Sequence, residues 1–179
     1  MSLRRPTPDE HDPYYGLYID QAPASNILGS MGTEVERTVA LLNDVPEDRT
    51  TFRYAPGKWS LREVVGHLID AEWTFTYRGL CFAREDPTPR PGFDQDQWVR
   101  SADAHAVPMA DLLASLRAAR HASLALFRTF GDAEWARSGL ANQVSFTVRC
   151  MPYILVGHEI HHRRVISERY LKALAVEPS

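Results

Sequence analysis

The segment from Val148 to Leu174 reads VRCMPYILVGHEIHHRRVISERYLKAL and decides the fold that we predict for the chain. Its length and apolar periodicity predict one long helix. Pro152 is compatible with this helix if it occupies the first turn, so we expect the helix to begin near Met151. His158 and His162 are four residues apart, which places both imidazoles on the same face of a helix, about one turn apart.

His158 and His162 share their stripe with Leu155, Val165 and Ile166, so we expect both imidazoles to point toward a helical core. A neutral imidazole that is buried there needs a partner. Two histidines at this spacing are typical of metal ligands. The alternative is a helix that happens to carry two histidines, each hydrogen-bonded and without a metal.

A second helix is predicted from a capping box, Ser60 followed by Glu63, and extends to about Phe82. His67 lies within its apolar arc and is the best candidate for a third ligand, because facing helices of a bundle commonly share a metal site. Three imidazoles leave coordination positions open, as in catalytic sites. Taken alone, His67 could also be a hydrogen-bonded core histidine. The arc is formed by Val64, Leu68, Ala71 and Phe75.

The run HEIHH also matches the His-Glu-x-x-His pattern of zinc peptidases, with Glu159 directly after His158. A protease would need a third ligand on the C-terminal side and a substrate cleft, which the sequence does not indicate. Glu159 remains a candidate catalytic acid or base, as do Asp70 and Tyr54. His161 lies about 100° around the helix from its neighbour, so we expect it beside the site or on the surface.

The remaining sequence predicts an all-α protein, a four-helix bundle in a single domain spanning residues 1–179. The other two long helices are expected at about 24–43 and 109–130, and residues 1–20 are expected to be extended. Residues 84–108 lack helical periodicity, and a connection of that length joins parallel neighbours rather than antiparallel ones. VSFTV, residues 144–148, could form a short strand or hairpin.

Composition indicates an ordinary globular protein. The chain has 179 residues and a formal charge of -3, which offers no basic excess for nucleic-acid binding. No apolar run reaches the roughly 20 residues that span a bilayer, and the N-terminus has no signal-peptide pattern, so we expect a cytoplasmic protein with no membrane partner. Cys81 and Cys150 are expected to be reduced and structural.

Two motifs, GKWSLREVVGHLIDAE and the downstream GHEIHHRRVISERYL, resemble the DinB/YfiT-like superfamily of small four-helix-bundle metalloenzymes. The resemblance covers nearly the whole chain. It implies an up-down-down-up topology with a long crossover between the second and third helices. It also implies a divalent metal ion such as nickel or zinc bound by His67, His158 and His162, and frequent homodimerisation.

The activity implied by this resemblance is a metal-dependent one on a small molecule. Some similar proteins are transferases that activate a low-molecular-weight thiol for transfer to an electrophile. A hydrolase that uses activated water would employ the same site. A third possibility is a non-catalytic metal-binding or interaction protein, in which aromatic residues line a pocket mouth or dimer contact instead of capping the core: Phe93, Trp98, Trp135 and Tyr153.

Overall fold

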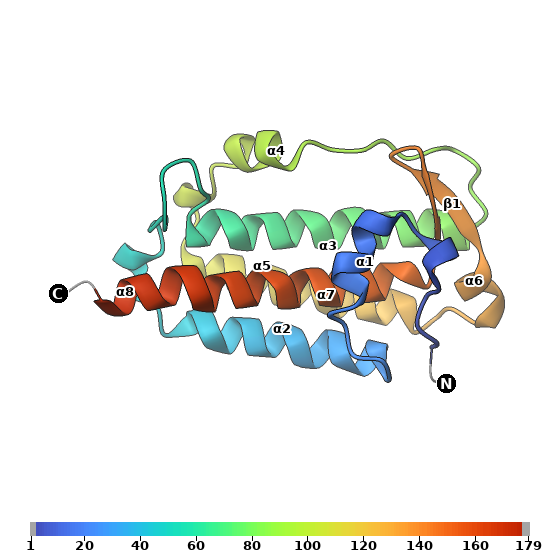
Figure 1. Ribbon diagram of the computed structural model, residues 1–179, viewed down its shortest axis with the longest axis horizontal. Coiled ribbons are helices and arrows are strands. Elements are labelled where there is room, and N and C mark those ends of the chain that lie inside the picture. Colours follow the sequence, from blue (N-terminus) through green and yellow to red (C-terminus); the bar gives the residue numbers. More distant parts are fainter. Residues whose placement is uncertain (1–2, 177–179) are drawn as a thin grey trace.

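Four long helices form the body of the computed structural model, which describes residues 3–176 (Figure 1). They are α2 (Ile27–Asn43), α3 (Leu61–Ala83), α5 (Met109–Phe127) and α7 (Cys150–Val165). The predicted capping box is present at the start of α3, where the Ser60 hydroxyl accepts the Glu63 amide and the Glu63 carboxylate accepts the Ser60 amide at 2.7 Å. The helix positions expected from periodicity are therefore confirmed.

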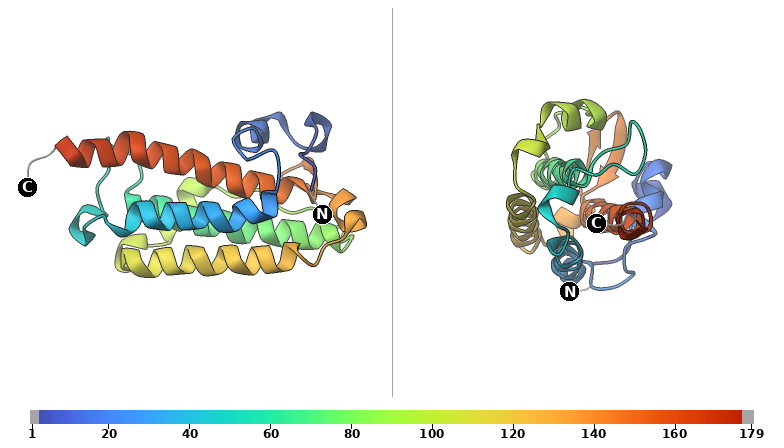
Figure 2. Two further views of the ribbon diagram at one scale, coloured as in Figure 1. Left: turned by 90° about the horizontal axis from the view of Figure 1, so that it is seen from below. Right: turned by 90° about the vertical axis from the view of Figure 1, so that its left-hand side faces the viewer.

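The bundle has the predicted up-down-down-up topology. Helices α2 and α7 run in one direction and α3 and α5 in the other (Figure 1). The two helices of each parallel pair pack together, and the pairs meet where α2 packs against α5 and α3 packs against α7. Figure 2 shows the four helices end-on. Residues 84–108 cross the length of the bundle between the parallel helices α3 and α5, and include α4 (Gln95–Ser101) and the 3-10 turn η3 (Ala104–Ala106).

The core consists of two apolar clusters separated along the bundle axis by a buried polar layer. The charged residues of this layer come from three of the four long helices, near the places where the two clusters meet. They are Glu72 of α3, Arg120 of α5 and Glu159 of α7, none more than 2% exposed. One cluster includes Met31, Ala71, Leu124 and Val156, and the other includes Val35, Leu68, Leu116 and Ile166.

The N-terminal segment differs from the expectation that residues 1–20 are extended, although Met1 and Ser2 lie outside the described residues. It contains the 3-10 turn η1 (Pro8–Glu10) and the helix α1 (Pro13–Ile19), which packs against α7 (Figure 1). The Asp12 carboxylate caps α1 by accepting the Tyr14 amide at 2.8 Å. Pro13 occupies the first helical position, where its ring favours a helix, so the proline density was a misleading sign of extended chain.

A short hairpin precedes the last helix, as the VSFTV run predicted. The 3-10 turn η2 (Glu47–Arg49) lies in the earlier loop between α2 and α3. The short helix α6 (Asp132–Ala136) leads into the hairpin, where strand β1 (Ser138–Ala141) pairs antiparallel with β2 (Val144–Thr147). Asn142 and Gln143 form the turn with φ values of 51° and 64°. Both angles lie in the left-handed region, which suits a two-residue hairpin turn.

The last helix continues past α7 as the π-helical turn η4 (Ile166–Leu171) and then as α8 (Lys172–Val176), so its predicted extent is confirmed but its i to i+5 turn was not foreseen. Cys81 and Cys150 are buried and unpaired, as expected. Between residues 3 and 176, no helix combines the length and apolarity needed to cross a membrane.

Candidate metal centre

Three imidazoles from two helices meet in the polar layer. His67 comes from α3, and His158 and His162 come from successive turns of α7. Their ligand nitrogens all lie within 4.8 Å of one another. His158 Nε2 is 3.0 Å from Nε2 of His67 and 3.0 Å from Nε2 of His162. The structure thus brings together the three histidines that the sequence singled out.

These imidazoles are held in their neutral form. Burial lowers the pKa of His67 to about 4 and the pKa of His162 to about 3. Burial, followed by repulsion from the neighbouring imidazoles, also lowers the pKa of His158 well below its usual range. Asp96 opposes the shift of the His67 pKa only in part. At neutral pH the three rings therefore keep nitrogen lone pairs that are available for coordination.

The donor set fits a divalent transition metal. Imidazole nitrogen suits zinc, nickel, copper and iron. Three protein ligands are the number found in catalytic zinc sites, where a further position is left for water or substrate. The two Nε2 to Nε2 contacts at 3.0 Å bring nitrogens together for which residues 3–176 provide no acidic hydrogen-bond partner, an arrangement that a bound cation would stabilise. The residues present thus satisfy the requirements of a three-histidine site.

Aromatic side chains cover the cluster on two sides. The Trp59 indole lies 4.8 Å from the His67 ring, centroid to centroid, and is nearly parallel to the His162 ring, with an interplanar angle of 18°. Its Nε1–H donates to Asp96 Oδ1 at 3.1 Å, which connects the cover to helix α4. From α1, Tyr18 meets the His158 ring edge-on at 5.0 Å.

Gly157 permits this close cover by α1. A Cβ atom at this position would lie 1.8 Å from the backbone oxygen of Tyr18, a distance that no side chain could tolerate. The glycine that precedes His158 therefore allows α1 to approach α7 beside the imidazole cluster. The role of Gly157 could not be predicted from the sequence, because a glycine within a helix has several possible reasons until the segment packed against it is known.

A pocket of about 380 Å³ opens beside the cluster, and His162 and Trp59 form part of its wall. His161 also lines it and touches the His162 ring edge-on at 5.3 Å, outside the group of three, as its position on the helix flank predicted. Tyr54, one of the candidate bases, lines the pocket as well. The third candidate, Asp70, lies elsewhere, in a groove on the outer face of α3.

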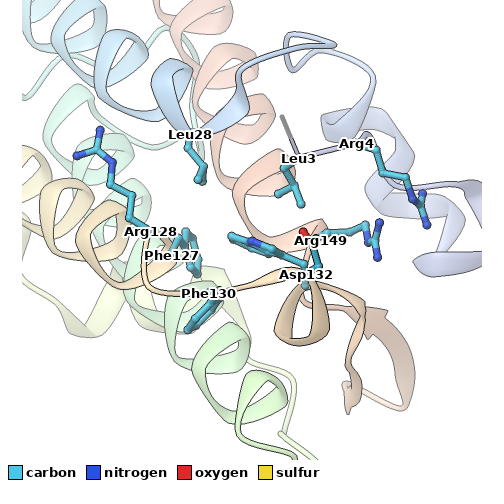
Figure 3. A pocket seen from close by; sticks show the side chains of 9 residues that line it. Leu3, Arg4, Leu28, Phe127, Arg128, Phe130, Asp132 and Arg149 are labelled. Atoms are coloured by element: carbon cyan, nitrogen blue, oxygen red, sulfur yellow. The ribbon is translucent and has the colours of Figure 1, made fainter. Parts of the chain in front are cut away.

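Another pocket, of about 370 Å³, lies at the far end of the bundle, where α5 ends and α2 begins (Figure 3). Its wall includes Phe127, Phe130 and Trp135, and contains no histidine. Trp135 is 5% exposed and Tyr153 is fully buried, so these two aromatics belong to the core, as the core-capping alternative proposed. Phe93 and Trp98 instead lie together in the groove on α3.

Glu159 points into a different cluster from its neighbour His158. Its Oε2 lies 2.8 Å from Arg120, which is also 2.8 Å from Glu72 Oε2. Burial raises the pKa of Glu159, and Arg120 opposes that shift. Burial alone would lower the pKa of Arg120, but the two carboxylates outweigh it and raise the pKa. The formal match to a zinc-peptidase motif therefore does not bring the Glu159 carboxylate into the imidazole cluster.

Sequence reasoning missed two components of this region. Trp59 and Asp96 come from loops and a short helix, where no periodicity reveals which residues meet. The buried ion pair of Arg120 with Glu72 and Glu159 could have been suspected, because each charged residue interrupts an apolar helix face. The pairing itself depends on how three helices pack.

Comparison with known proteins supports this description. A family model described as the DinB superfamily matches residues 33–166. A protein of Geobacillus kaustophilus with the provisional name of metal-dependent hydrolase is 28% identical over 164 residues, which cover 83% of this chain and 88% of that protein. YfiT of Bacillus subtilis, with the same provisional name, is 26% identical over 145 residues, covering 79% of each chain.

A solved structure of YfiT from Bacillus subtilis shares the fold. It matches 96% of this chain and 94% of its own with a TM-score of 0.69 at 19% sequence identity. That protein is described as having an unusual four-helix bundle topology. The up-down-down-up arrangement with its long crossover is therefore common to both structures.

Proposed function

Because this chain belongs to the DinB superfamily, we propose that it is a metal-dependent enzyme whose divalent ion, nickel or zinc, is held by His67, His158 and His162. The observation that carries the proposal is the convergence of three imidazoles, two buried and one partly buried, within 4.8 Å. The provisional names of the relatives in Geobacillus and Bacillus support a metal-dependent activity. A small-molecule substrate fits the pocket of about 380 Å³ beside the cluster.

We favour transfer of a low-molecular-weight thiol to an electrophilic small molecule. When bound, a divalent ion lowers the pKa of a coordinated thiol or water and so provides a nucleophile at neutral pH. In the transfer, the sulfur forms a bond to the electrophilic carbon, the leaving group departs with its bonding electrons, and the thiol proton passes to solvent. The pocket supports a substrate of this kind, because Lys58 and His161 offer donors for anionic groups and Trp59 offers an apolar wall.

The chain's own residues prepare the site in three ways. Burial keeps the imidazoles unprotonated, so that their lone pairs are free at neutral pH. Trp59 and Tyr18 limit the access of water to two sides of the cluster. The ion pair with Arg120 holds the Glu159 carboxylate outside the imidazole cluster, so we give Glu159 no proton transfer in the proposed reaction. The catalytic role that the sequence suggested for Glu159 stays a prediction.

Hydrolysis is the second candidate, because both relatives named above carry the provisional name of hydrolases. It would use the same histidines, with water in place of the thiol. The two activities differ in whether product formation requires a thiol. A non-catalytic metal protein would show neither activity.

The test combines metal quantitation with two assays. Purified protein is stripped with a chelator, reloaded with zinc or nickel, and analysed for bound metal per chain. It is then assayed for conjugation of a low-molecular-weight thiol to a haloalkane or an epoxide, and separately for ester and amide hydrolysis without thiol. We expect conjugation that disappears on chelation and returns on reloading. Hydrolysis without thiol would replace the transferase proposal with the hydrolase.

A matched pair of variants tests the ligand assignment. His158→Ala removes the central imidazole, and we expect it to lose tight metal binding. His161→Ala removes the adjacent imidazole outside the group of three, and we expect it to bind one ion per chain as the wild type does. If His158→Ala retained as much metal as the wild type, the three-histidine site would be rejected, whatever activity the protein showed.

A further inference from the structure

A second groove, of about 330 Å³, lies between the outer face of α3 and the crossover segment. Its α3 wall includes Asp70, Trp73 and Tyr77, which succeed one another at helical spacing on one face. Its other wall includes Phe93 and Trp98, whose rings contact each other at a tilt, with centroids 4.6 Å apart. None of its lining residues lines the pocket beside the imidazoles.

The aromatic walls of this groove are unusually open to solvent. Trp73 is 53% exposed, Tyr77 is 55% exposed and Trp98 is 41% exposed. Single exposed apolar side chains are common on protein surfaces, but a group of large ones along one groove marks an interaction site. Tryptophan is also the side chain whose face attracts cations most strongly.

Asp70 supplies a negative charge to the same groove. Its carboxylate is half-buried, and among residues 3–176 it has no hydrogen-bond or ion-pair partner. Burial without a compensating cation raises the pKa of Asp70. A desolvated carboxylate beside aromatic faces would gain most from a ligand that carries positive charge.

The positive side chains of the groove are already engaged at its other end. Arg78 donates to the Pro91 carbonyl at 2.7 Å and lies over the Phe93 ring at 5.9 Å. Arg90 pairs with Asp86 and lies over the Tyr77 ring at 5.4 Å. Because Arg78 is two turns beyond Asp70, about 12 Å along α3, its guanidinium does not neutralise the Asp70 carboxylate. Within the described residues, no cation covers Trp73 or Trp98.

We propose that this groove binds a small organic cation, a primary or substituted ammonium on an aromatic body. The ammonium group pairs with Asp70, and the aromatic body packs on Trp73 and Trp98. The arginines over Tyr77 and Phe93 repeat the same type of contact with the protein's own cations. The site lies outside the imidazole cluster and does not depend on the function proposed for it.

Two probes with the same ring and opposite charge test the proposal. Tryptamine carries an ammonium group and indole-3-acetate carries a carboxylate, and each is titrated by calorimetry into the metal-loaded full chain. We expect tryptamine to bind roughly tenfold or more tightly than indole-3-acetate, because only the ammonium gains a charge-assisted contact with Asp70. Equal affinities, or tighter binding of the acid, would overturn the proposal.

Three variants locate the binding. Asp70→Asn keeps the shape of the groove and removes its charge, so we expect it to weaken tryptamine binding by roughly tenfold. Trp98→Ala removes one aromatic wall and should weaken both probes. Asp111→Asn, an exposed acid of α5, is the matched control and should bind tryptamine as the wild type does. Unchanged tryptamine affinity in Asp70→Asn would show that the carboxylate is not the anchor.

A second copy of the chain is the other candidate occupant of the groove. Light scattering on the wild type and on Trp73→Lys distinguishes it, because a lysine in an apolar contact would dissociate such a dimer. A wild-type dimer that becomes monomeric in Trp73→Lys, together with no tryptamine binding, would replace the ligand proposal with an interface. Tryptamine binding that leaves the oligomeric state unchanged would support the ligand proposal.

Discussion

His158 and Glu159 are neighbours on α7, yet they enter two buried clusters that are stabilised in different ways. The Glu159 carboxylate meets Arg120, which also binds Glu72, so a cation within the protein compensates the acidic charge. The Nε2 atom of His158 instead lies beside those of His67 and His162, and this group of three bases contains no acid. One cluster contains a cation from the chain itself, and the other presents lone pairs to a ligand.

This difference separates a structural polar cluster from a candidate functional one. Burial opposes the charged forms of both His158 and Glu159, but only the cluster of Glu159 contains a counter-charge. Burying nitrogen lone pairs in the core costs free energy unless a hydrogen-bond donor or a cation binds them. A buried polar group therefore indicates function less by its burial than by the absence of a compensating charge in its own cluster.

The largest effect is expected from removing the cation of the acidic cluster. Arg120→Leu leaves Glu72 and Glu159 buried without a cation, and we expect it to lower the free energy of unfolding by roughly 3–5 kcal/mol. Urea unfolding of the metal-free protein measures this. Arg117→Leu removes an exposed pair with Glu36 and should cost far less, because water and salt screen exposed ion pairs. Equal losses in the two variants would show that Arg120 does not hold the layer together.

A pH series sharpens the comparison from the side of the imidazoles. In the metal-free protein, an unfolded histidine binds a proton below about pH 6.5, whereas His67 in the folded chain remains neutral down to about pH 4. The unfolded state therefore binds more protons in this window, so stability rises with pH and is lost as pH falls from 6.5 toward 4.

A variant of His67 tests whether this residue causes the loss of stability at low pH. We expect His67→Asn to reduce the pH dependence of the free energy of unfolding by up to about 1.4 kcal/mol per pH unit in that window, about 3 kcal/mol in all. Urea unfolding between pH 4.5 and 7.5, with a chelator present, measures it. His121→Asn, an exposed histidine of α5, is the control and should keep the wild-type slope. An unchanged slope in His67→Asn would contradict the neutral imidazole cluster.

The smallest effect concerns the two glycines that precede the ligands. Gly157→Ala places a Cβ atom 1.8 Å from the Tyr18 backbone oxygen, so α1 must shift, and we expect a loss of about 1–3 kcal/mol together with weaker metal binding. Gly66→Ala, in the same position before His67, meets only Ala104 Cβ at 3.7 Å.

Gly66→Ala is therefore the matched control, and its better helix propensity should leave the protein as stable as the wild type or up to about 1 kcal/mol more stable. Thermal unfolding and metal titration of both variants measure the difference. If Gly157→Ala behaved like Gly66→Ala, the close cover of the imidazole cluster by α1 would not matter for the site.

The sequence by itself determined the bundle, its crossover and the three histidines. These follow from local rules: the apolar period places the helices, the capping box starts α3 at Ser60, and a spacing of four residues puts His158 and His162 on one face. The strand at residues 144–147 and the unpaired cysteines were also predicted from short patterns, but the partner strand at residues 138–141 was not.

Only the tertiary structure decided how those elements meet. The helix at Pro13–Ile19 was missed because a proline can either start a helix or keep a chain extended, and Asp12 decides which. The partner of Glu159 is Arg120, and Trp59 is held by Asp96, so both depend on side chains separated by tens of residues in sequence. Such contacts depend on the packing of several helices together, which no periodicity along one of them encodes.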